Sequence, residues 1–134
     1  MVRTERVGTI EVITLDRPER RNALDHPTLL ELIDVQERLR GDISAARTRV
    51  VVLTGAPPAF CAGADLTGVE EGQFATDLGT VLRNFTELSA PVLAAIDGPA
   101  LGAGTQLVVA CDLRIATPES QLGIPAARLG LVVD

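Results

Sequence analysis

Two stretches of sequence decide the fold: VVVLTGAPPAFCAGADL at residues 50–66 and VLAAIDGPALGAG at residues 92–104. Each begins as a hydrophobic run typical of a buried strand and ends in a loop of small residues rich in glycine. We expect the two strands to be neighbours in a sheet, so that both loops lie at its carboxyl edge, where open α/β sheets bind ligands. Small residues there let backbone N–H groups converge on one point, which predicts an oxyanion hole.

The composition indicates one domain over residues 1–134 and excludes several classes of function. Of the 134 residues, 46% are hydrophobic, enough to fill a core without metals or disulfides. The chain has no Lys, Trp or Tyr, which excludes Schiff-base chemistry, a phosphate-loop lysine and a Tyr–Lys dehydrogenase pair. A net charge of −6 and only three Phe argue against a nucleic acid partner. Local arginines could still hold one small anionic ligand.

The cysteines and the single histidine form no metal-binding pattern. Cys61 and Cys111 are far apart and outside any CxxC motif, so we expect two reduced, buried thiols and no metal site. A nucleophilic role for Cys61 is disfavoured, because its side chain faces the core if the next loop residues present their N–H groups. His26, beside Pro27 at a helix start, is expected to be exposed and without a partner.

The chain carries no recognisable membrane or export signal. Three of its first six residues are charged, so the start of the chain lacks the apolar core of a signal peptide, and no segment approaches the ~18 consecutive apolar residues that a membrane span needs. We therefore expect a cytoplasmic protein with no membrane span.

Strand and helix patterns alternate along the chain. A turn at residues 7–9 separates residues 3–6 from the alternating run 10–15, which predicts an opening β-hairpin. Asp25 can cap a helix, and Pro27 is tolerated in its first turn. The other predicted elements are strands at 49–54, 92–96 and 112–116 and helices around 78–88 and 105–111. This alternation predicts an α/β fold of ββα and βα units on a largely parallel sheet.

Three motifs resemble, in the same order, those of the crotonase (enoyl-CoA hydratase/isomerase) family. They are RP at 17–18 with NAL at 22–24, FCAGADL at 60–66, and GPALGAG at 98–104 leading to ACD at 110–112. The resemblance runs from about residue 10 to residue 134. It implies a crotonase-like spiral of ββα units, assembled as a homotrimer or a dimer of trimers. It also implies binding of acyl-CoA, a coenzyme A thioester serving as substrate or ligand, with no prosthetic group.

The same resemblance places the substrate site on the two loops. The thioester oxygen would accept hydrogen bonds from the backbone N–H groups of Ala64 and Ala103, and the helix starting near Ala103 adds its positive end. The substrate-binding positions that the family implies are Arg20, Ala62, Gly63, Ala64, Asp65, Leu66 and Ala103. For Arg20 and Arg21, a solvated charge pair is the alternative. Asp65 is expected to brace its loop rather than act as a base.

Two positions depart from the family pattern. Hydratases of the family add water with two glutamates, and Gln106 and Ala126 stand at those positions. Neither can exchange a proton near neutrality, which disfavours hydration. Asp134 matches an essential aspartate of dienoyl-CoA isomerases and a dehalogenating branch, and it is the candidate base for proton transfer next to a thioester enolate. The alternative for Asp134 is a helix cap or simply the chain end.

Other interpretations of the sequence stay open. The altered glutamates also fit a catalytically silent acyl-CoA carrier or sensor in fatty-acid metabolism, and a structural fragment that binds nothing is a third option. The loops could serve close packing alone, or GPALGAG could be a dinucleotide turn, although the Tyr and Lys of such dehydrogenases are missing. The family continues into helices that cover the acyl pocket, so a chain ending at Asp134 predicts a truncated or naturally short form with exposed apolar surface.

Overall fold

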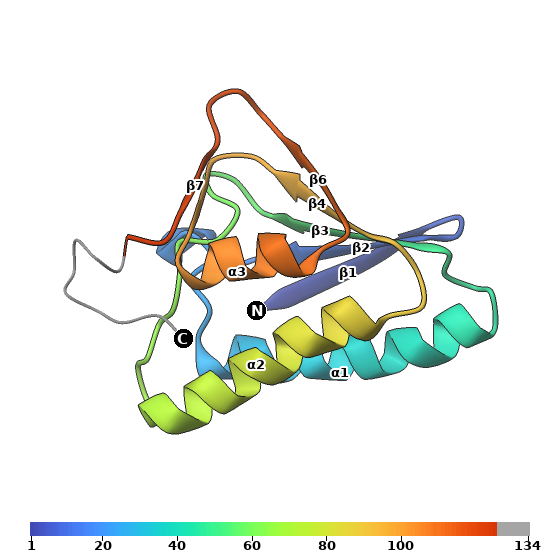
Figure 1. Ribbon diagram of the computed structural model, residues 1–134, viewed down its shortest axis with the longest axis horizontal. Helices are drawn as coiled ribbons and strands as arrows, with labels where there is room; N and C mark the ends of the chain where they lie inside the picture. The colour runs from blue at the N-terminus through green and yellow to red at the C-terminus, as the bar shows by residue number, and fades with distance from the viewer. Residues whose placement is uncertain (126–134) are drawn as a thin grey trace.

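The computed structural model describes residues 1–125 as a five-stranded sheet, a small second sheet and three main helices (Figure 1). The large sheet has the order β1-β2-β3-β4-β6, and the small one pairs β5 with β7. In chain order the elements are β1 (Val2–Val7), β2 (Ile10–Leu15), the short 3₁₀ helix η1 (Pro18–Arg20), α1 (His26–Ser44), β3 (Val50–Gly55), α2 (Glu71–Glu87), β4 (Val92–Ile96), β5 (Pro99–Leu101), α3 (Ala103–Ala110), β6 (Leu113–Ala116) and β7 (Gln121–Gly123).

The predicted hairpin and the predicted parallel sheet are both confirmed. β1 and β2 pair antiparallel, with Val2 opposite Leu15, around a turn in which Gly8 has a φ of +62°. Strands β2, β3, β4 and β6 are all parallel, so β3 and β4 are neighbours as expected. Because parallel strands end at the same edge, the loops after β3 and β4 start side by side.

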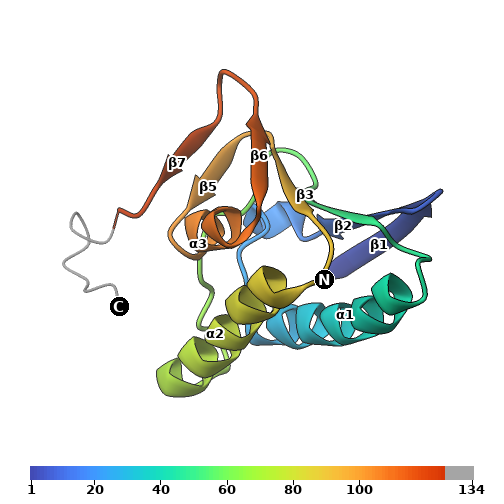
Figure 2. The same cartoon turned by 45° about the vertical axis from the view of Figure 1, so that its right-hand side comes forward.

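The chain forms a spiral in which each turn contributes to both sheets and then adds a helix. After β2, β3 and β4 in the large sheet, the chain passes through Leu24, through Cys61–Ala64 and through β5, and then enters α1, α2 and α3. Parallel bridges join Leu24 to Ala64 and Cys61 to Ala100, and β7 pairs with β5 (Figure 2). This arrangement confirms the expected spiral of ββα units.

The sequence patterns missed the second sheet. Strands β5 and β7 were not predicted, whereas α3 begins at Ala103, near the expected start. Both strands have only three residues, too few to show an alternating pattern. Their hydrogen bonds go to segments distant in sequence, so only the tertiary structure defines them.

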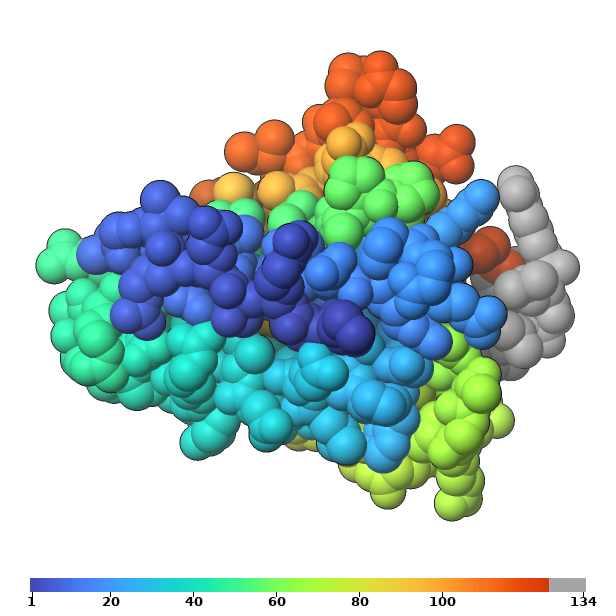
Figure 3. Space-filling view, turned by 180° about the vertical axis from the view of Figure 1, so that it is seen from behind, coloured from blue at the N-terminus to red at the C-terminus, as the bar shows by residue number. Residues whose placement is uncertain are grey.

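Amphipathic helices close the core against the large sheet. α1 and α2 lie side by side in both ribbon views (Figures 1 and 2), and α1 begins where expected, with the Asp25 carboxylate accepting from the Thr28 N–H at 2.9 Å. Seen from behind, the β1–β2 hairpin and α1 form a continuous surface, while the region around β6 projects from it (Figure 3). Fully buried side chains that fill the core include Leu29, Leu32, Val51, Leu53, Phe60 and Phe85.

A buried asparagine anchors the loop between β2 and α1. Asn22 is 1% exposed and has a φ of +58°, a conformation that asparagine tolerates better than most residues. Its Oδ1 accepts from the Arg17 N–H at 2.8 Å, and its Nδ2 donates to the carbonyls of Ala56 at 2.7 Å and Ala59 at 2.8 Å. One side chain therefore fixes the loop before α1 to the loop after β3.

We expect Asn22→Ala to lower the free energy of unfolding by about 3 kcal/mol, because a buried side chain loses three hydrogen bonds at a site that also disfavours alanine. Urea unfolding monitored by circular dichroism measures this change. The control is Gln73→Ala, which removes an exposed amide bonded to Asp77 and should change stability by less than about 0.5 kcal/mol. Equal effects of the two substitutions would contradict the anchoring role.

No helix within residues 1–125 is long and apolar enough to cross a membrane. Those same residues contain no group of three His, Cys, Asp or Glu side chains arranged to hold a metal ion.

Candidate active site

The two glycine-rich loops touch through their backbones. The Leu101 N–H donates to the Cys61 carbonyl at 2.9 Å, and the Phe60 N–H donates to the Pro99 carbonyl at 3.1 Å. Gly104, in the first turn of α3, packs so closely that an added Cβ would overlap the Cys61 carbonyl oxygen and lie 2.9 Å from the Cys61 Cβ. The absence of a side chain at Gly104 therefore lets α3 start directly against the first loop.

The Ala64 N–H points away from Leu24, which lies beside the first loop. The Gly63 carbonyl accepts from the Leu24 N–H at 2.8 Å, and the N–H and C=O of a trans peptide point in opposite directions. The next N–H, that of Ala64, is therefore directed to the other side. Gly63 has a φ of +124°, which an L side chain rarely adopts. Within residues 1–125, the Ala64 N–H donates to no protein acceptor.

The Ala103 N–H is the first donor of α3 and is oriented by the same principle. The Gly102 carbonyl accepts from the Gln106 N–H at 3.1 Å, so the Ala103 N–H, in the same peptide, points out of the helix start. Gly102 has a φ of +55°, and its own N–H donates to the Gly123 carbonyl at 2.9 Å. A Cβ built on Gly102 would lie 3.9 Å from the Gly63 Cα, so the residues preceding the two donors are neighbours.

Asp65, directly after Ala64, is held by five interactions. Its Oδ1 accepts from the Thr67 N–H at 3.1 Å and from the Thr67 hydroxyl at 2.6 Å. Its Oδ2 accepts from Arg17 at 2.9 Å and lies 3.5 Å from the Arg20 guanidinium, and its own N–H donates to the Leu24 carbonyl at 2.7 Å. The hydrogen bonds from Thr67, together with Arg17, hold the pKa of the Asp65 carboxyl far below its usual range. Asp65 therefore braces the loop as an ionised group, as expected.

Gln106 lines an open, mostly apolar cavity of about 490 Å³ between α2 and α3. It stands three residues after Ala103, and i, i+3 positions share a helix face. Leu82, Val109 and Ile124 supply apolar walls, and Arg83 and Thr86 line the α2 side. The other two candidate catalytic positions, Ala126 and Asp134, lie outside the described residues.

The remaining predicted substrate-binding residues are Ala62 and Leu66, which belong to the first loop, and Arg20, which lies beside it. Ala62 is partly buried, and its N–H donates to the Arg21 carbonyl at 3.0 Å. Leu66 is exposed. The Arg20 side chain is 57% exposed beside Asp65. The structure therefore brings Cys61 and Gly63 of the first loop against the segment that enters α3, with Arg20 exposed beside Asp65.

His26 has a partner, so the expectation that nothing pairs with it was wrong. Its Nε2 lies 2.8 Å from Asp77 Oδ2, and the side chain is 27% exposed. Asp77 belongs to α2, which packs against α1. This contact between two helices is invisible in the local sequence, because 51 residues separate the partners.

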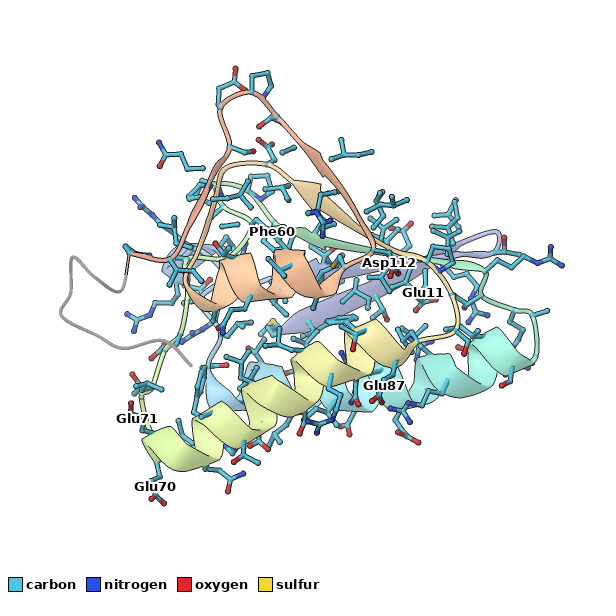
Figure 4. All side chains as sticks on the ribbon, viewed as in Figure 1. Glu11, Phe60, Glu70, Glu71, Glu87 and Asp112 are labelled. Atoms are coloured by element: carbon cyan, nitrogen blue, oxygen red, sulfur yellow. The ribbon has the colours of Figure 1, made fainter. Side chains whose placement is uncertain are left out.

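Both cysteines are buried free thiols, as expected. Burial raises the pKa of Cys61 to about 11 and the pKa of Cys111 to about 12. A thiol with so little thiolate is a poor nucleophile. In Figure 4, the neighbouring Phe60 lies on the loop that follows β3, near the start of α3, and it is fully buried.

At pH 8 we expect both thiols of the folded protein to react with a disulfide reagent at least about 100-fold more slowly than free cysteine, since the thiolate fraction falls tenfold for each unit of pKa. Colorimetric thiol titration measures the rate, and the same protein unfolded in urea is the control. A thiol that reacts in the folded protein at the rate of free cysteine would contradict this prediction.

Sequence reasoning missed the residues that support the first loop. Arg17 and the segment Asn22–Leu24 were noted only as motif letters, yet they make the hydrogen bonds that orient Gly63 and Asp65. The available signal was a cluster of polar residues between a strand and a helix cap. It gave no indication of the distant partners.

Comparison with solved structures identifies the architecture as the crotonase fold. An enoyl-CoA hydratase from Bacillus anthracis matches with a TM-score of 0.88 and 35% identity, covering 98% of this chain and 53% of that one. An enoyl-CoA hydratase/carnithine racemase from Magnetospirillum magneticum matches with a TM-score of 0.87 and 34% identity, covering 99% of this chain and 52% of that one.

The sequence itself matches the family described as enoyl-CoA hydratase/isomerase over residues 5–134, and the chain belongs to this family. A probable enoyl-CoA hydratase from Mycobacterium leprae is 41% identical over 138 residues, covering 100% of this chain and 53% of the relative. A short-chain-enoyl-CoA hydratase from Clostridium acetobutylicum is 37% identical, covering 95% of this chain and 50% of the relative. The chain thus spans about half the length of these relatives.

Proposed function

We propose that this chain binds acyl-CoA thioesters and stabilises a thioester enolate between the N–H groups of Ala64 and Ala103. The observation that carries the proposal is the pair of N–H groups without protein acceptors within residues 1–125, on two loops whose backbones are in contact. Both donors follow a glycine with positive φ and are fixed by the carbonyl of the same peptide. Such a preorganised pair needs no rearrangement as charge develops on the thioester oxygen.

Donors of this kind contribute substantially to transition-state stabilisation. Loss of one oxyanion-hole donor costs about 2.7–4 kcal/mol of transition-state stabilisation in other enzymes. Ala103 adds the positive end of α3, which further favours negative charge at this point. Family membership supplies the ligand class, because the relatives are named as hydratases of enoyl-CoA.

The reaction proposed is proton transfer next to the thioester, of the isomerase type, rather than hydration. The amide of Gln106 does not titrate near neutrality, and Ala126 has no polar side-chain atom. Asp134 is the proposed base. No metal or prosthetic group enters the proposal, and coenzyme A is part of the substrate.

The test is to incubate the purified protein with a dienoyl-CoA and, separately, with crotonyl-CoA. We expect isomerisation of the dienoyl thioester, lost in Asp134→Asn, and slow or absent hydration of crotonyl-CoA. Rapid hydration of crotonyl-CoA would contradict the proposal that Gln106 and Ala126 prevent hydration. Isomerisation that persists in Asp134→Asn would remove Asp134 from the mechanism.

A second candidate function is that of a catalytically silent acyl-CoA carrier or sensor. It is favoured because Gln106 and Ala126 stand at the two glutamate positions, while the Ala64 and Ala103 N–H groups have no protein acceptor within residues 1–125. Calorimetric binding of acyl-CoA, without product from any thioester of a substrate panel, would support it. Product from any thioester would exclude it.

We further propose that the protein works in the cytoplasm, in fatty-acid metabolism, as a homotrimer or a dimer of trimers. Large apolar side chains that lie exposed on β6 and β7, namely Leu113, Ile115 and Leu122, support burial of this region in an assembly. Analytical ultracentrifugation tests the oligomeric state, and a monomer at micromolar concentration would contradict it.

A further inference from the structure

The segment between β2 and α1 holds the first loop along its whole length. Leu24 donates to the Gly63 carbonyl at 2.8 Å and accepts from the Asp65 N–H at 2.7 Å, so it brackets Ala64 on both sides. The direction of the Ala64 N–H follows from the first of these bonds, because it fixes the plane of the Gly63–Ala64 peptide. The interactions that hold Leu24 next to Asp65 therefore determine the direction of the Ala64 N–H.

Arg17 is the side chain that joins these two segments. Its Nη1 donates to Asp65 Oδ2 at 2.9 Å and to the Ala23 carbonyl at 3.2 Å, and its Nη2 lies 3.4 Å from Asp25 Oδ2. The Arg17 side chain is 20% exposed and that of Asp65 is 9% exposed, so water screens this pair only partly. One planar guanidinium thus links Ala23 and Asp25, on either side of Leu24, to Asp65, which follows Ala64.

The charge of Arg17 matters as well as its geometry. The Asp65 carboxyl stays ionised. A carboxylate whose side chain is only 9% exposed needs a cation beside it. Arg17 supplies that cation at hydrogen-bond distance, whereas the more exposed Arg20 lies 3.5 Å away.

We propose that Arg17, acting through the Asp65 carboxylate, is a positioning residue that balances the charge of that carboxylate and fixes the direction of the Ala64 N–H. This inference rests on the proposed function, because it assigns a role toward the same thioester oxygen. Neither residue touches the reacting atoms. Removing either one should therefore weaken polarisation of the thioester more than it weakens binding.

The experiment measures that polarisation directly. Hexanoyl-CoA carrying ¹³C at the thioester carbonyl is bound to the protein, and difference infrared spectroscopy records the frequency of the carbonyl band. Calorimetry gives the affinity of the same complex. The variants are Arg17→Gln, Asp65→Asn and the double substitution. Arg3→Gln, which removes an exposed arginine paired with Asp16, is the control. Melting curves establish that each protein is folded.

In the unsubstituted protein and in Arg3→Gln we expect a band shifted to lower frequency than in free hexanoyl-CoA. In Arg17→Gln and Asp65→Asn most of that shift should be lost, while the affinity falls less than about tenfold. The double variant should lose no more than either single variant, because the two residues act as one unit.

The outcomes separate the two proposals. Absence of binding, or of any band shift in the unsubstituted protein, would overturn the proposed function and this inference with it. A full shift in the unsubstituted protein that persists in folded Asp65→Asn, the variant that keeps the side-chain volume, would overturn this inference alone. Additive losses in the double variant would show that Arg17 does not act through Asp65.

Discussion

Replacing Gly104 by alanine is expected to lower the free energy of unfolding by about 3 kcal/mol and to abolish acyl-CoA binding. The added methyl group would overlap the Cys61 carbonyl oxygen and lie 2.9 Å from the Cys61 Cβ. Cys61 is fully buried, and its carbonyl accepts from Leu101, so neither partner can move without breaking the contact between the loops. Relief of the overlap would separate α3 from the first loop and the Ala103 N–H from the Ala64 N–H.

The matched control is the same substitution in α2. A Cβ at Gly79 meets no atom within 4 Å, so Gly79→Ala should raise the free energy of unfolding by about 0.5–1 kcal/mol through helix propensity. Urea unfolding and calorimetry with an acyl-CoA measure both variants. If Gly104→Ala is as stable as Gly79→Ala and binds the thioester normally, the close approach of the two loops is not required.

Replacing Asp42 by alanine is the second substitution for which we expect a large loss, about 2–3 kcal/mol of unfolding free energy. Three arginines converge on this carboxylate near the end of α1: Arg6 at 2.8 Å, Arg38 at 2.9 Å and Arg47 at 2.9 Å. Arg6 and Arg38 also contact Glu11, which is 2% exposed on β2 and labelled in Figure 4. Removing Asp42 leaves Arg6 and Arg38 with Glu11 as their acidic partner and takes the carboxylate away from Arg47. We expect less than the 3–5 kcal/mol typical of a fully buried pair because the arginines reach solvent.

The acid sensitivity of the protein should change with this variant. Hydrogen bonds from Arg47, and then Arg38, hold the pKa of the Asp42 carboxyl below its ordinary value of 3.8. A carboxyl whose pKa is lower in the folded state stabilises the fold above the ordinary value, and that stabilisation is lost as the pH falls below it. Between neutral pH and about pH 3, Asp42→Ala should therefore lose less stability than the unsubstituted protein.

The control for Asp42 is Asp34→Ala, the same change at an exposed position of α1. It should alter the free energy of unfolding by less than about 0.5 kcal/mol and leave the acid profile unchanged. Urea unfolding at several pH values measures all three proteins. Equal stability of Asp42→Ala and Asp34→Ala would mean that the arginine cluster contributes nothing measurable.

Asp42, Arg17 and Gly104 act at different places in the same fold. The cluster around Asp42 fixes the β1–β2 hairpin to α1, and Arg17 fixes the start of α1 to the first loop. Gly104 then allows α3 to dock on that loop. The positions of the Ala64 and Ala103 N–H groups therefore depend on Arg17 and on the close approach at Gly104, while the Asp42 cluster stabilises the neighbouring hairpin and helix.

The sequence by itself determined the elements whose signals are local. The alternation at residues 10–15, the Asp25 cap and the apolar runs after residues 49 and 91 each depend on neighbours within a few positions, and each is found where expected. The three motifs were enough for the family and its fold, because their order and spacing are rarely matched by chance.

Only the tertiary structure decided how the candidate site is held. The second sheet consists of three-residue strands and single bridges, and Arg17, Asn22 and His26 each have a partner that lies 34 to 51 residues away. Such contacts leave no periodic pattern, because a hydrogen bond between distant segments constrains two positions and nothing between them. The direction of an N–H group likewise depends on which atom its peptide carbonyl binds, and that is settled only when the chain has folded.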